Sequence, residues 1–93
     1  MAVAEQKFRV ISEDPALIMR RLVRHWAHKY ETELDDTSGR VHLGEQGSVV
    51  MQWVESALAI QIQADDQAGC DTLREIVVAH LQNFEGERPL RVE

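Results

Sequence analysis

The fold of this chain is decided by residues 48–64, SVVMQWVESALAIQIQA. Residues 57–64 alternate between two faces, with Leu, Ile and the last Ala on one face and Gln on the other, which is the pattern of a half-buried strand. Residues 48–54 are a second, strongly apolar strand, and Glu55-Ser56 is a turn between the two. A short turn joins antiparallel neighbours, so this stretch predicts a β-hairpin.

Segments on both sides of this hairpin predict further strands. They cover residues 5–12, 31–35, 40–43 and a short last strand within 89–92. The cluster Asp35-Asp36-Thr37-Ser38-Gly39 predicts a turn between two of them, with Gly39 suited to a positive φ. A second turn at residues 44–47 leads into the hairpin.

Two amphipathic helices are predicted from apolar residues that recur every three to four positions. Asp14-Pro15 begins the first helix, because Asp accepts hydrogen bonds from free N–H groups and Pro suits the first turn. This helix runs to about Tyr30, whereas the second begins after Asp65-Asp66, runs to about Phe84 and ends at Gly86. The two apolar stripes are Ile18, Met19, Leu22, Val23, Trp26 and Tyr30, and then Leu73, Ile76, Val77, His80, Leu81 and Phe84.

The resulting order, β-α-β-β-β-β-α with a last β from the tail, predicts an α+β fold. A curved antiparallel sheet with both helices on one face gives a two-layer sandwich, since each helix must bury its apolar stripe. This order resembles the TATA-box-binding-protein-like architecture, an analogy of fold that implies nothing about DNA. Ninety-three residues without a linker or repeat predict a single domain over residues 1–93.

Charge is distributed unevenly along the chain. The net charge of −6 argues against nucleic-acid binding, because such binding rests on neutralising phosphates. Residues 15–30 hold four cations and no acid, so this segment carries +4 and the remainder carries −10. The first helix is therefore predicted to be a cationic region of an anionic protein.

The composition also restricts location and chemistry. Residues 5–7 interrupt any apolar run that a signal peptide would need, and no apolar stretch approaches the roughly 20 residues that span a bilayer. We therefore expect a cytoplasmic protein with no membrane partner. Cys70 is the single cysteine, which excludes an internal disulfide, and neighbouring aspartates should raise its pKa and leave an inert thiol. The chain has neither a Gly-rich phosphate loop nor a Gly-x-Ser-x-Gly motif.

Three histidines form the first candidate site, with His25 and His28 near the end of the first helix and His80 in the second. Residues three apart on a helix are neighbours, and His80 could approach His25 if the helices pack side by side. Neutral imidazole binds zinc and iron, and three histidines would leave an open coordination position. In the alternative, His80 is a core residue that donates to a backbone carbonyl or to His25, and His28 is solvated. The structural alternative outweighs the metal site, so no metal cofactor is expected.

Arginines form the second candidate, an anion site made of Arg21 and Arg24 together with His28 and Arg20. Arginine suits the bidentate recognition of carboxylates and phosphates. A siderophore carboxylate, a nucleotide phosphate or an acidic protein partner would fit it, and the alternative is a solvated helix face.

The third candidate is the uncovered face of the sheet, which is normally wet in an antiparallel sheet. Whichever side of the 48–54 strand faces inward, some apolar surface faces outward, and this predicts a patch for self-association or for a partner. The polar members of that face are expected to be Arg9, Glu31, Glu33, Arg40, His42, Gln52, Gln61 and Gln63.

The stretches RLVRHWAHK (residues 21–29) and HLQNF (residues 80–84) resemble a bacterial family catalogued as domain of unknown function 2218. The resemblance extends from Phe8 to Val92 and includes Gly39, Leu58 and Ala64-Asp65. It implies a bacterial protein, sometimes encoded near or joined to the siderophore-interacting reductases of iron uptake. It supplies no catalytic residues.

These observations predict a small binding or accessory domain without enzymatic activity, which the resemblance links to iron–siderophore metabolism. Its first helix would bind a metal chelate, an anion or a protein partner. His25, His28 and His80 would contact the ligand, and Arg21 and Arg24 would attract the anion. Two alternatives stay open: a metal-dependent enzyme that uses the three histidines, and a structural homodimer formed through the sheet face.

Overall fold

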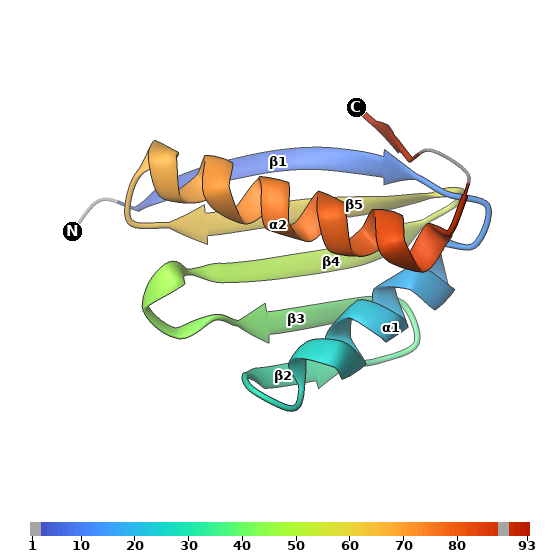
Figure 1. Ribbon diagram of the computed structural model, residues 1–93, viewed down its shortest axis with the longest axis horizontal. Helices are drawn as coiled ribbons and strands as arrows, with labels where there is room; N and C mark the ends of the chain where they lie inside the picture. Colours follow the sequence, from blue (N-terminus) through green and yellow to red (C-terminus); the bar gives the residue numbers. More distant parts are fainter. Residues whose placement is uncertain (1–2, 88–89) are drawn as a thin grey trace.

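Six strands and two α-helices make up the computed structural model, which describes residues 3–87 and 90–93 (Figure 1). In chain order they are β1 (Ala4–Ile11), α1 (Pro15–Trp26), β2 (Glu31–Leu34), β3 (Ser38–His42), β4 (Ser48–Val54), β5 (Ala57–Ala64), α2 (Gln67–Glu85) and β6 (Arg91–Val92). A single 3-10 turn, η1 (Gly44–Gln46), joins β3 to β4. The sheet order is β2-β3-β4-β5-β1-β6, and all neighbouring strands are antiparallel. The predicted α+β fold is therefore confirmed.

The hairpin predicted from residues 48–64 forms the middle of this sheet as β4 and β5. Val49 pairs with Ile62 and Met51 pairs with Ile60, so these side chains share the inward face. All four have at most 2% of their surface exposed. The alternation along residues 57–64 thus decides which side of the sheet receives the helices.

Both helices lie on the same face of the sheet (Figure 1). α1 packs mainly on β2 and β3, whereas α2 packs mainly on β5 and β1, and the two helices also contact each other. Their apolar stripes and the inward side chains of the sheet form one buried cluster. The arrangement is the predicted two-layer sandwich. No helix among the described residues is long and apolar enough to cross a membrane.

Helix α1 begins as predicted but ends four residues early. Pro15 occupies its first turn, and the Asp14 carboxylate accepts from the Leu17 N–H at 3.2 Å. The helix ends at Trp26, not at Tyr30, because the Trp26 carbonyl accepts from the N–H groups of both Lys29 and Tyr30, at 3.0 and 2.8 Å. This tightened turn reverses the chain into β2 while Tyr30 still packs against the core.

Helix α2 and the last strand follow the prediction closely. The Asp66 carboxylate accepts from the Gly69 N–H at 2.7 Å, and Gly86 ends the helix with φ 90°. The tail adds β6, in which Val92 pairs with Val10. Pro89, where that strand was expected to begin, lies outside the described residues.

Gly39 has a different role from the one predicted. It lies inside β3 and pairs with Met51, and it is not among the described residues with positive φ. A Cβ atom at this position would lie 2.8 Å from Val23 Cγ2 on α1. Gly39 is therefore required for the close approach of helix and sheet, and β3 begins at Ser38 rather than after the turn.

Candidate functional site

Four cations occupy the outer side of α1 and the turn that follows it, and we call them the α1 basic surface: Arg20, Arg21, Arg24 and Lys29. They lie there because the positions between them are apolar and buried against the sheet, including Met19, Leu22, Val23 and Trp26. Arg20 is half-buried and the other three are exposed. Residues three and four apart face the same side of a helix, so the guanidinium groups converge on one surface.

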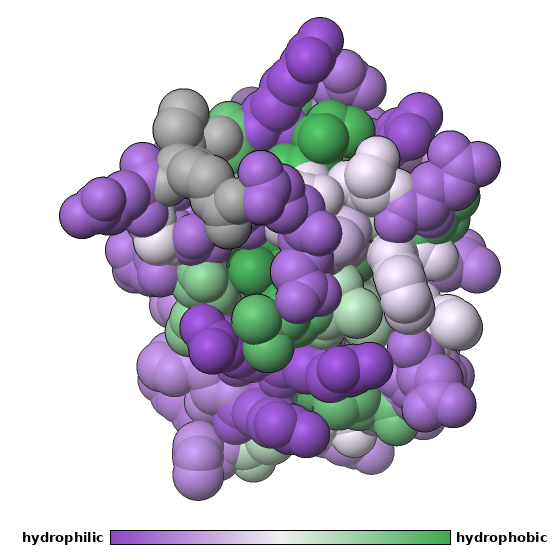
Figure 2. Space-filling view, turned by 90° about the vertical axis from the view of Figure 1, so that its right-hand side faces the viewer, coloured by the Kyte–Doolittle hydropathy of each residue, from purple (hydrophilic) through white to green (hydrophobic). Residues whose placement is uncertain are grey.

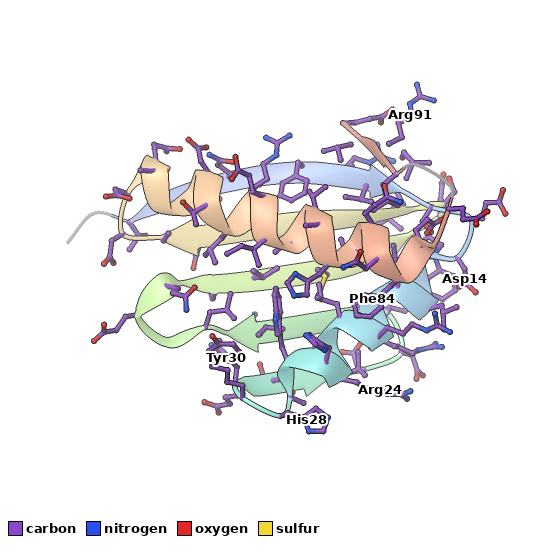
Figure 3. The ribbon with its side chains drawn as sticks, in the orientation of Figure 1. Asp14, Arg24, His28, Tyr30, Phe84 and Arg91 are labelled. Atoms are coloured by element: carbon purple, nitrogen blue, oxygen red, sulfur yellow. The ribbon has the colours of Figure 1, made fainter. Side chains whose placement is uncertain are left out.

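No acidic side chain neutralises the α1 basic surface within residues 3–87 and 90–93. Ion pairs there involve Lys7, Arg40, His42 and Arg91, and none involves an arginine of α1. The side chain of Arg24 points away from the body of the molecule (Figure 3). Lys29 lies over the ring of Tyr30, with its Nζ 5.5 Å from the ring centroid. The arginines are therefore free to bind carboxylates or phosphates of another molecule.

Large apolar side chains are exposed at one end of the molecule, and we call this group the apolar end. Leu17, Leu34, Trp53 and Val54 are 36%, 39%, 41% and 43% exposed. They belong to the start of α1 and to the ends of β2 and β4; in Figure 1 the start of α1 and the end of β4 lie on the right, and β2 runs toward that side below α1. Viewed from that end, apolar groups show between hydrophilic side chains (Figure 2). The sequence pattern did not predict this group, since Trp53 and Leu34 occupy inward positions of their strands.

The structure brings two of the three candidate histidines together. The ring centroids of His25 and His80 are 5.4 Å apart, and His80 also packs on Trp26 at 5.2 Å. Phe84 joins this group, with its ring centroid 6.2 Å from that of His25. His28 lies in the turn after α1, and its side chain points away from the molecule (Figure 3). α1 ends at Trp26, between His25 and His28, so only His25 lies within the helix.

His80 makes the backbone contact that the structural alternative predicts. Its Nδ1 lies 2.8 Å from the carbonyl oxygen of Ile76, one turn earlier in α2. A carbonyl oxygen can only accept, so Nδ1 carries the proton and Nε2 of a neutral ring has a free lone pair. The side chain of His80 is half-buried rather than fully in the core, and the facing His25 is exposed. In the described part of the chain, no three His, Cys, Asp or Glu side chains are grouped to hold a metal ion.

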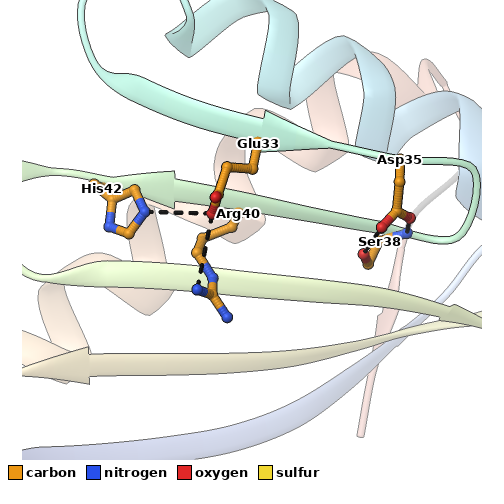
Figure 4. Close-up of polar contacts among 5 residues, drawn as sticks. All are labelled: Glu33, Asp35, Ser38, Arg40 and His42. Carbon is orange, nitrogen blue, oxygen red and sulfur yellow. Dashed lines mark hydrogen bonds and ion pairs between the residues drawn. The ribbon is translucent and has the colours of Figure 1, made fainter.

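The uncovered sheet face carries the polar residues that the alternation predicts. The Glu33 carboxylate forms an ion pair with Arg40, at 3.8 Å, and lies 3.6 Å from His42 Nε2, with which it pairs when the ring is protonated; both contacts join β2 to β3 (Figure 4). A hollow of about 500 Å³ is lined by the apolar residues Val50 and Ala59 of this face, together with Phe8 and Ile60. Its polar lining comes from Lys7, Arg9, Gln52, Gln61 and Glu93. The predicted outward apolar surface therefore exists, as Val50 together with Val54.

Cys70 is fully buried on α2. Burial raises the pKa of its thiol, and the charges of Asp71 and Asp66 raise it further. The thiolate that nucleophilic chemistry requires is disfavoured, as predicted.

Comparison with known proteins supports the fold and the family. The family model described as "Uncharacterized protein conserved in bacteria (DUF2218)" matches residues 8–93. A solved structure, "NMR structure of PA4090 from Pseudomonas aeruginosa", has the same fold with a TM-score of 0.79 and 22% identity, over 96% of this chain and 92% of that chain. No curated protein matches the sequence. Because the family model spans nearly the whole chain, this protein belongs to the bacterial DUF2218 family.

Proposed function

We propose that this chain is a binding domain without enzymatic activity that docks an acidic segment of a partner protein on α1. The observation that carries the proposal is the set of arginines on α1, which have no acidic partner in the described structure, beside sixteen acids elsewhere in the chain. Uncompensated cations on one helix attract and orient an anionic partner.

A protein partner fits this surface better than a small molecule does. The outer side of a helix is convex, whereas small-molecule sites are concave and enclose most of the ligand. Leu17 precedes Arg21 by one helical turn, so the apolar end adjoins the α1 basic surface. Arginine and tryptophan beside exposed apolar groups are typical of protein interfaces. We propose that such a partner belongs to iron–siderophore metabolism, on the association of the family with siderophore-interacting reductases.

The proposal is tested with a fluorescent synthetic peptide composed of Glu, Asp and a single Leu. We expect saturable binding that weakens as salt rises, because the screening length falls from about 10 Å at 0.1 M to about 3 Å at 1 M. Amide shifts should be confined to residues 17–29 and the apolar end. Exchanging both arginines in R21E/R24E should weaken binding about tenfold or more, which corresponds to about 1.4 kcal/mol.

The matched control is R9E/R91E, which changes the net charge equally but on the uncovered sheet face and β6. Both residues are exposed, so the variant should fold and bind as the unsubstituted protein does. Equal losses in the two double variants would mean that net charge, and not the α1 basic surface, drives binding. Binding that is indifferent to salt would also contradict the proposal.

A homodimer formed through the uncovered sheet face is the second candidate. The hollow lined by Val50 and Ala59 supports it, since these apolar residues lie among polar residues of which Lys7, Arg9 and Gln52 are exposed. Sedimentation velocity over a range of concentrations tests it. We expect the mass of the unsubstituted protein to rise with concentration and the mass of V50E to stay that of the monomer. A monomer mass of the unsubstituted protein at every concentration would reject the homodimer.

A further inference from the structure

We propose that His25 and His80 form a two-histidine site for a divalent transition-metal ion such as Zn²⁺, whose other coordination positions are filled by water or an exogenous anion. The inference is separate from the proposed docking function, because it uses neither the arginines of α1 nor the apolar end. It rests on the spacing of the two rings, the hydrogen bond that holds one of them, and the exposure of the other.

The spacing of the rings suits a shared metal ion. With metal–nitrogen bonds of about 2.0–2.1 Å, two imidazole rings on a tetrahedral ion have their centroids about 5 Å apart. The rings of His25 and His80 are 5.4 Å apart and inclined by 48°. They are contributed by two helices that the core holds side by side, so the separation is set by the fold.

His80 has the orientation that a metal-binding histidine commonly has. A ligating imidazole usually donates its second N–H to a carbonyl or carboxylate, which fixes the tautomer and makes the other nitrogen more basic. The carbonyl oxygen of Ile76 lies 2.8 Å from Nδ1 of His80 and accepts its hydrogen bond, and packing on Trp26 restricts the rotation of the ring. The lone pair that remains is on Nε2, and it has no hydrogen-bond partner in the described structure.

His25 is the second ligand of the site, and its side chain is free to rotate. Its side chain is exposed, and neither ring nitrogen is hydrogen-bonded within residues 3–87 and 90–93. It can therefore rotate toward a metal ion without losing a contact other than its packing on His80 and Phe84. Imidazole nitrogen is a ligand that suits Zn²⁺, Cu²⁺ and Ni²⁺, and two such ligands leave further positions open.

The test is a titration of the full chain with Zn²⁺ in chelator-free buffer, followed through the histidine ring ¹⁵N and ¹H signals. We expect saturable shifts of the His25 and His80 rings, with the largest ¹⁵N change of His80 on Nε2 and with its Nδ1 still protonated. His28 and His42 should not shift. Absence of any ring shift up to about 1 mM Zn²⁺ would overturn the proposal, since weaker binding would not be specific.

His25→Gln is the decisive variant, because the residue is exposed and makes no hydrogen bond, so the protein should fold normally. We expect it to weaken Zn²⁺ binding about tenfold or more, the order of loss seen when a metal site is disturbed. His42→Gln is the matched control on β3, and it should leave the affinity unchanged. An affinity in H25Q equal to that of H42Q would show that the two rings only pack on each other.

Discussion

Gly39 sets the distance between α1 and the sheet because it has no side chain. It lies opposite Met51 in β3, directly below Val23 and Met19 of the helix. An added Cβ would meet Val23 Cγ2 at 2.8 Å and Met19 Cγ at 3.5 Å. Valine has no flexible arm that could move aside, so the helix itself would have to shift.

We therefore expect Gly39→Ala to destabilise the protein by about 1–3 kcal/mol, the usual cost of overpacking a core. Chemical denaturation of the purified variant measures this. In a Val23→Ala background the same substitution should cost clearly less, because the colliding methyl group is absent. Equal costs in the two backgrounds would show that the contact with α1 is not the cause.

At the scale of elements, the connection between β2 and β3 is held by one carboxylate. Asp35 accepts from the Thr37 N–H at 2.9 Å. It also accepts from the Ser38 N–H at 2.8 Å and from the Ser38 hydroxyl at 2.9 Å (Figure 4). These hydrogen bonds lower the pKa of Asp35 below its ordinary value of 3.8, with the Thr37 N–H as the largest cause. The charged form of Asp35 thus stabilises the turn.

Because the folded-state pKa of Asp35 is lowered, its contribution is fully present above the ordinary pKa and is lost as the pH falls through the folded value. Asp35→Asn should therefore be less stable than the unsubstituted protein at pH 7, and the difference should shrink toward pH 3. Thermal melts at both pH values test this. Asp36→Asn is the control, since Asp36 makes no hydrogen bond in the described structure, and it should leave the stability at pH 7 nearly unchanged.

At the scale of the whole molecule, a single cluster joins both helices and strands β1, β3, β4 and β5. Nothing in that cluster divides it into independent parts, so we predict one cooperative unfolding transition. Trp26 is 7% exposed within the cluster, whereas Trp53 is 41% exposed. In the Trp53→Phe variant, Trp26 fluorescence and far-ultraviolet circular dichroism should give coincident denaturation curves. Separate midpoints would show that α1 unfolds apart from the sheet.

Much of this fold follows from short-range patterns in the chain. The β4–β5 hairpin, the Asp14-Pro15 and Asp66 helix starts and the Gly86 helix end are confirmed. Each depends on residues a few positions apart, and alternation or a capping side chain is enough to encode it. The cationic character of α1 and the buried thiol of Cys70 are likewise evident from composition and periodicity.

Tertiary structure alone decided the features that depend on residues distant in sequence. The contact of Gly39 with Val23 arises where α1 meets the sheet, and Trp53 is exposed although its position in β4 faces inward. The histidines show the same limit: the sequence allowed His80 to approach His25 only if the two helices pack side by side, and the packing of α1 on α2 meets that condition. The physical reason is that local patterns specify which face of an element is buried, but only the packed core determines what that face meets.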